Sequence, residues 1–137
     1  MEIEAVANRE PSAGSRFWLS RSSSATEPGR TYAGSVITCV VHYVIDPGQI
    51  EAFERFAREW MRLVAQHGGV HHGYFLPAEG ASDRAEALFS FASLAAYEQY
   101  RARFGQDPEF VAADRIRDES GCVLRYERTF MRPLLPE

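Results

Sequence analysis

Two adjacent histidines, His71 and His72, lie inside a short apolar segment and are the residues best suited to chemistry in this chain. Imidazole titrates near neutral pH, so it can accept or donate a proton under physiological conditions. Neighbouring side chains of a regular strand point to opposite faces, so the two rings serve different sites unless Gly73 marks a bulge. We expect at least one ring to line a cavity as a general acid or base, with Tyr74 or Tyr43 holding a substrate oxygen beside it.

The same alternation divides the neighbours of the two histidines. It places His72 with Tyr74 on one face and His71 with Phe75 on the other, and it leaves open which face meets the interior. Either ring could instead be a structural residue whose nitrogens hydrogen-bond within an interface. The predicted catalytic residues are therefore His72, His71 and Tyr74, with the structural interpretation of each histidine as the alternative.

Other side chains could bind a substrate. Arg125 could anchor an anionic group, or it could form an ion pair with Glu127, two residues further along the same segment. His42 lies in the middle of the predicted strand among valines, which is more typical of a core or interface histidine than of a ligand contact. The aromatic residues could line an apolar pocket or simply form the core. The predicted substrate-binding residues are His42, Tyr43, Arg125, Trp60, Phe89 and Tyr97.

We recognise no cofactor motif. The four histidines and two cysteines have none of the spacings typical of zinc sites, although His42, one of the adjacent histidines and a carboxylate could together bind a metal. The chain contains no lysine, which excludes Schiff-base catalysis, covalent pyridoxal phosphate and a Walker-type phosphate loop. The sequence therefore predicts neither a cofactor nor a metal.

Length and composition are those of one globular domain. The 137 residues are 45% hydrophobic and 25% charged, and the net charge of −4 argues against nonspecific binding to nucleic acid or anionic lipid. The apolar runs are too short to span a membrane, and we see no secretory signal pattern. Two cysteines without disulfide-scaffold spacing suit the cytoplasm. All fifteen basic residues are arginine, a bias that hints at a GC-rich bacterial genome.

The chain divides near residue 35. Residues 1–35 are rich in Ser, Gly and Pro without a sustained period, and we expect a flexible extension. From there a domain of residues 36–134 begins. Segments with the hydrophobic pattern of a strand alternate in it with segments that have the period of a helix and a capping residue at their start. We expect strands at 36–45, 70–77, 87–92 and 122–133, and helices from Asp46-Pro47 to His67, after Ser93, and from Asp107-Pro108 to Gly121. This β-α-β-β-α-β order predicts a ferredoxin-like α+β fold.

The first strand is apolar on both faces, apart from Thr38 and His42. An open sheet with helices on one side would then expose an apolar face to solvent. We expect an identical sheet to cover it across a two-fold axis, which makes the predicted partner a second copy of the chain.

Three segments resemble the NIPSNAP family over about residues 36–134. They are "YEQYRARFGQDPEF" at Tyr97–Phe110, "GYFLPAEG" at Gly73–Gly80 and "LRYERTFMRP" at Leu124–Pro133. The resemblance implies a dimeric α+β barrel with a cavity between sheet and helices. That superfamily includes cofactor-free monooxygenases of aromatic compounds, haem-binding and haem-degrading proteins, isomerases and decarboxylases.

Three functions follow from the residues and the resemblance. The first is cofactor-free acid/base or oxygenase-type chemistry on a small aromatic or polyketide-like molecule. The second is a noncatalytic module that binds a small molecule or another protein. The third is a haem-handling protein with a histidine ligand.

Overall fold

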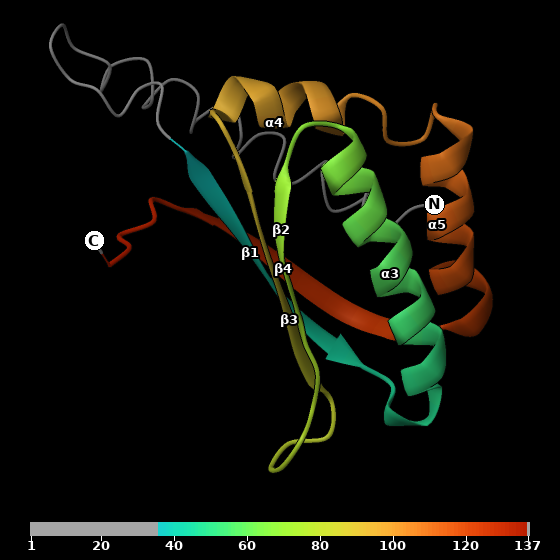
Figure 1. The fold of residues 1–137 in the computed structure, drawn as a ribbon. Coiled ribbons are helices and arrows are strands. Elements are labelled where there is room, and N and C mark those ends of the chain that lie inside the picture. The colour runs from blue at the N-terminus through green and yellow to red at the C-terminus, as the bar shows by residue number, and fades with distance from the viewer. Residues whose placement is uncertain (1–35, 137) are drawn as a thin grey trace, which may run out of the picture.

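The computed structural model describes residues 36–136, so our expectation for residues 1–35 lies outside the described part of the chain. The elements in chain order are β1 (Ile37–Ile45), the 3₁₀ turn η1 (Pro47–Gln49), α3 (Ile50–Gln66), β2 (Val70–Phe75), β3 (Arg84–Phe91), α4 (Leu94–Arg101), α5 (Pro108–Ser120) and β4 (Val123–Met131). All three α-helices lie on the same side of one sheet (Figure 1).

The four strands form an antiparallel sheet in the order β2-β3-β1-β4. This order and the β-α-β-β-α-β sequence of elements confirm the predicted ferredoxin-like α+β fold. β1 is a central strand with a hydrogen-bonded neighbour on each side, which explains its high content of β-branched residues.

The core lies between the sheet and the helices. From β1 the side chains of Cys39, Val41, Tyr43 and Ile45 enter it, and each is no more than 3% exposed. The helix α3 contributes a stripe at three- and four-residue steps, as its period predicts. The buried members of that stripe are Ala52, Phe53, Phe56, Ala57, Trp60, Leu63 and Val64.

Local capping chemistry sets the element boundaries. The Asp46 side chain accepts a hydrogen bond from the Gly48 N–H, and Ser93 and Asp107 cap α4 and α5 in the same manner. Gly121 ends α5 in the left-handed conformation, at φ 68°. β3 begins three residues before the predicted start, at Arg84, because pairing with β1 extends through a segment whose sequence reads as a turn.

β2 contains a bulge, the exception to regular strand alternation that the sequence analysis considered at Gly73. His71 pairs with Phe89 and Gly73 pairs with Leu88, so His72 is an extra residue without a partner. Gly73 has φ 118°, which a residue with a side chain rarely adopts. The predicted grouping of His72 with Tyr74 is therefore wrong, since the bulge moves every residue after it to the opposite face.

Gly69 marks a close approach between the end of α3 and β3. A Cβ at this position would lie 2.7 Å from Val64 Cγ1 and 2.8 Å from Phe91 Cζ. We expect Gly69→Ala to lower the free energy of unfolding by about 1–3 kcal/mol, because two core side chains must shift. Urea denaturation measures the change. Gly48→Ala is the control, since its Cβ would meet only Asp46 Oδ1 at 3.4 Å; equal effects of the two substitutions would contradict the prediction.

Candidate functional site

The sheet separates the predicted site residues into two groups. Tyr43, Trp60, His71, Tyr74, Phe89 and Tyr97 surround a small cavity between the sheet and the helices. His42 and Arg125 line a larger hollow on the opposite face of the sheet, the open face, which no helix covers. Tyr43 also contributes to the lining of this hollow. His72 lies on the open face outside that hollow. The three predicted catalytic residues therefore do not converge on one site.

His71 lies in a stack of aromatic rings on the helix side. Its ring is 5.1 Å from that of Tyr74, at an interplanar angle of 9°, and 5.5 Å from that of Phe89. Tyr74 in turn stacks on Tyr43 at 5.9 Å, and their hydroxyl oxygens are 3.5 Å apart. The bulge in β2 produces this arrangement, because it turns Tyr74 to the same face as His71.

The protonation of His71 is set by its surroundings. Burial, and to a lesser extent the neighbouring His72, lowers the pKa of His71 to about 4. Its Nδ1 accepts a hydrogen bond from the Gly73 N–H at 2.9 Å. The neutral ring therefore carries its proton on Nε2 and can donate a hydrogen bond there, whereas taking up a second proton would break the Nδ1 bond.

The cavity beside these rings is small. Its volume is about 10 Å³, which is at the lower limit for a single water molecule. Arg128 and Tyr100 also line it, and the Arg128 guanidinium donates a hydrogen bond to the Tyr97 hydroxyl. Sequence reasoning missed Arg128. Arg128 faces the helices because the β1–β4 register pairs it with Val41, and this register is not visible in the local sequence.

The three strand histidines, His42, His71 and His72, lack the surroundings of a haem ligand. The ring of His71 lies between two aromatic rings, its Nδ1 is occupied, and the cavity beside it is about 10 Å³. His72 and His42 are each engaged by a neighbouring side chain, Ser90 and Glu86 respectively. Among the described residues, none of these three histidines therefore combines a free imidazole nitrogen with an apolar slot for a macrocycle.

His72 takes part in a short chain of hydrogen bonds on the open face. Its Nε2 lies 2.7 Å from Ser90 Oγ, which lies 2.7 Å from Thr38 Oγ1. Ser90 and Thr38 are directly opposite each other in the β1–β3 register, and both are buried. The contact with Ser90 holds the side chain of the bulged residue against β3.

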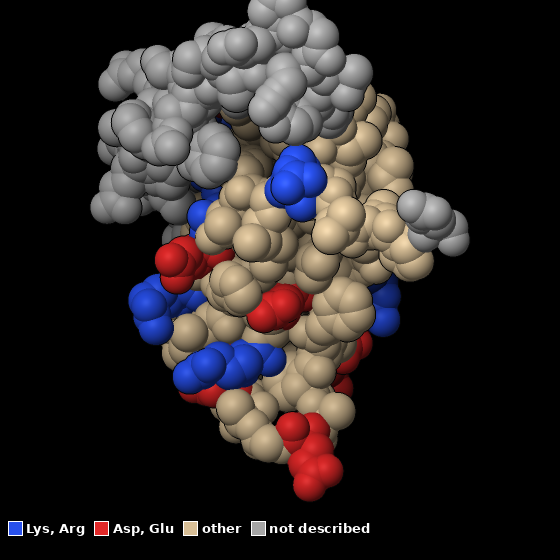
Figure 2. Space-filling view, turned by 90° about the vertical axis from the view of Figure 1, so that its left-hand side faces the viewer, with Lys and Arg blue, Asp and Glu red and all other residues tan. Residues whose placement is uncertain are grey.

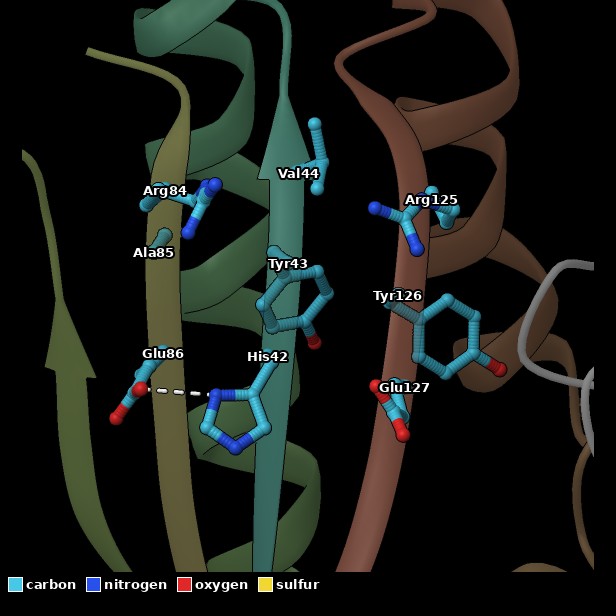
Figure 3. A pocket seen from close by; sticks show the side chains of 9 residues that line it. All are labelled: His42, Tyr43, Val44, Arg84, Ala85, Glu86, Arg125, Tyr126 and Glu127. Carbon is cyan, nitrogen blue, oxygen red and sulfur yellow. Dashed lines mark ion pairs between the residues drawn. The ribbon is translucent and has the colours of Figure 1, made fainter. Parts of the chain in front are cut away.

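The hollow on the open face has a volume of about 270 Å³, close to the lower end of ligand pockets at roughly 300 Å³. Near its centre, His42 Nδ1 lies 2.8 Å from Glu86 Oε2, and the other ring nitrogen faces away from Glu86 (Figure 3). About half of each side chain is exposed, so the pair is in contact with water. Cross-strand register places Glu127 on the other side of His42.

Charged side chains of opposite sign lie in neighbouring levels of this face, where a level is a row of residues that pair across β3, β1 and β4. Glu86, His42 and Glu127 share one level, and Arg84, Val44 and Arg125 share the next. Figure 2 shows both signs gathered in the lower half of the open face, among uncharged side chains. The face is therefore more polar than the apolar first strand predicts.

The described residues 36–136 contain no group of three or more His, Cys, Asp or Glu that could hold a metal. Within the same range, no helix is long and apolar enough to cross a membrane. Arg125 and Glu127 form no ion pair with each other, so the ion pair considered in the sequence analysis is absent.

The family model of NIPSNAP matches residues 40–135, which is more than half of the chain. The chain belongs to the NIPSNAP family. This confirms the resemblance noted in the three sequence segments. No curated protein matches the chain significantly.

Solved structures of NIPSNAP proteins share the fold. A NIPSNAP-like domain protein from Burkholderia xenovorans is 20% identical, with a TM-score of 0.62 over 74% of this chain and 87% of that one. A NIPSNAP family protein of unknown function from Agrobacterium tumefaciens is 22% identical, with a TM-score of 0.62 over 73% of this chain and 89% of that one. At these identities the likeness supports the fold alone.

The lowered pKa of His71 predicts a pH-dependent stability. Between about pH 6.5 and pH 4 the unfolded chain binds a proton at His71 that the folded chain does not, so stability falls as the pH falls through this range. One pKa unit corresponds to about 1.4 kcal/mol, and because the ring keeps some contact with water we expect a loss of only about 1–2 kcal/mol.

Urea denaturation over this pH range checks the prediction. His71→Gln should flatten the dependence, whereas Gly48→Ala, which changes no titratable group, should leave it as in the wild type. An unchanged slope in His71→Gln would contradict the assignment.

Proposed function

We propose that this NIPSNAP protein binds a small molecule in the open-face hollow and that His42 exchanges a proton with it. The observation that carries the proposal is the 2.8 Å contact between His42 Nδ1 and Glu86 Oε2 inside a hollow of about 270 Å³. A carboxylate that accepts the Nδ1 proton leaves the Nε2 lone pair available, which is the arrangement of an oriented general base.

His42 suits this role better than the other two strand histidines. The neutral ring of His71 has its acceptor nitrogen bound by the Gly73 N–H and lies beside a cavity of about 10 Å³. The Nε2 of His72 is engaged by Ser90. We therefore propose cofactor-free acid/base chemistry on a small aromatic molecule, with the site on the open face of the sheet.

Deuterium exchange tests this proposal without knowledge of the natural substrate. Phenylacetone is an uncharged aromatic ketone whose α-protons exchange with D₂O when a base removes them. We expect the wild type to accelerate exchange and His42→Gln to lower that acceleration by about 100-fold, a typical contribution of a general base. Glu86→Gln should have a smaller effect in the same direction, because it keeps the ring but weakens its orientation. NMR follows deuterium incorporation.

His72→Gln is the matched control, since it removes a histidine from the same face outside the hollow. It should leave exchange within about twofold of the wild type, an effect of under ~0.5 kcal/mol. Absence of acceleration by the wild type, or an equal loss in His72→Gln, would count against the proposed role of His42.

Binding without turnover is the second candidate function. It is favoured by the interior, where side chains leave only about 10 Å³ between sheet and helices, and by a hollow that is open on one side. Saturable binding of phenylacetone without deuterium incorporation would favour this candidate.

We also propose that two copies pack through their open faces. In the centre of this face Val40 and Leu88 lie opposite each other and are only partly buried, and Phe75 and Met131 are more than half exposed. Apolar residues within a patch of both charge signs suit a self-complementary two-fold contact, which would also enclose the hollow.

Sedimentation velocity tests this association. We expect the wild type to sediment as a dimer at micromolar concentration and Leu88→Arg to shift it to monomer, because the guanidinium would be buried at the contact. Val111→Arg, on the outer surface of α5, is the control and should remain a dimer. A monomeric wild type would contradict the proposal.

The cytoplasm of a bacterium is the location that we propose. In its support, Cys39 and Cys122 are both buried free thiols, which suits a reducing compartment. The exclusive use of arginine as the basic residue supports the bacterial origin.

A further inference from the structure

We infer that Arg84 and Arg125 form a clasp for a singly charged carboxylate on the ligand of the open-face hollow. The inference rests on the proposed function in one respect, that this hollow is the ligand site. It adds the chemical class of the ligand, a small organic acid.

The sheet register brings the two arginines to one level. Arg84 of β3 and Arg125 of β4 both pair with Val44 of β1, so they flank the same residue from opposite sides. Figure 3 shows the two guanidinium groups on either side of Val44. The two guanidinium groups carry like charges that repel each other, so an anion between them would be stabilised by both.

Both guanidinium groups retain donors for a ligand. Arg125 forms no hydrogen bond or ion pair with the described residues 36–136. Arg84 has one ion pair, from Nε to Asp83 Oδ1 at 3.7 Å, in which the arginine side chain is 73% exposed. A long, exposed pair of this kind contributes little, so it leaves Arg84 available. The planar fork of a guanidinium matches the two oxygens of a carboxylate.

The neighbouring level of the sheet restricts the charge of the ligand. Glu86 and Glu127 lie two residues along the strands from the arginines, at a rise of about 3.4 Å per residue, and flank His42. A second negative charge would be repelled by these carboxylates, which favours a monoanion over phosphate. A carboxylate held by the arginines would place the rest of a small planar molecule toward His42, roughly 7 Å along the strand.

Paired ligands of equal shape test the inference. Benzoate carries the carboxylate, benzamide is its uncharged counterpart, and inorganic phosphate is an anion without the ring. In NMR titrations we expect benzoate to bind at least about tenfold more tightly than benzamide, since two charge-assisted hydrogen bonds are lost in the amide. Phosphate should compete weakly, and benzoate affinity should fall as salt is raised.

Four substitutions identify the residues. Arg125→Gln and Arg84→Gln should each weaken benzoate binding about tenfold and leave benzamide binding unchanged. His42→Gln should retain the preference for benzoate. Arg58→Gln is the matched control, since Arg58 is an exposed arginine on α3 whose ion pair with Glu54 spans 3.5 Å.

Equal affinity for benzoate and benzamide would overturn the inference, as would benzoate binding that is unaffected in Arg125→Gln. Phosphate that binds more tightly than benzoate would overturn the carboxylate class. Dissociation of the dimer by Arg125→Gln with unchanged benzoate affinity would assign the arginines to the subunit contact and overturn the clasp. Phenylacetone carries no charge, so its exchange tests the acid/base proposal independently of the clasp.

Discussion

The pairing of β1 with a neighbour on each side is the constraint on which the rest of the structure depends. Because side chains alternate along a strand, one set from β1 must enter the core and the other must face away from the helices. The first set, which includes Tyr43, is buried with the helices. The second set carries His42, whose flanking strands bring Glu86 and Glu127 to it at fixed register. The same hydrogen bonds that hold the sheet together therefore build the charged hollow.

The bulge in β2 is the second constraint, and it decides which residues meet. If β2 were a regular strand without the bulge, Tyr74 would point away from His71, and the aromatic stack that buries both would not form. The bulge needs a glycine at position 73 for its φ of 118°. One flexible backbone position thus sets the burial of His71, and burial in turn lowers its pKa.

The fold could be predicted from sequence because its signals are local. A capping Asp46, a Gly121 stop and an α3 stripe at helical period depend only on residues near one another. The site could not be predicted in the same way, because it depends on register between distant strands. Nothing near His42 in the sequence indicates that Glu86 lies 2.8 Å from its ring. The inward direction of Arg128 likewise follows only from its pairing with Val41.

The two faces of the sheet differ in what they allow a charged group to do. Between sheet and helices, burial disfavours the charged form of His71, so a proton taken up there would cost stability. On the open face, the side chains of His42 and Glu86 keep about half of their surface in contact with water. A second copy covering this face would lower the local dielectric constant and strengthen both the His42–Glu86 contact and any contact of an anion with Arg125. Association and proton exchange would then be linked, because the same step that encloses the hollow would strengthen the groups that act in it.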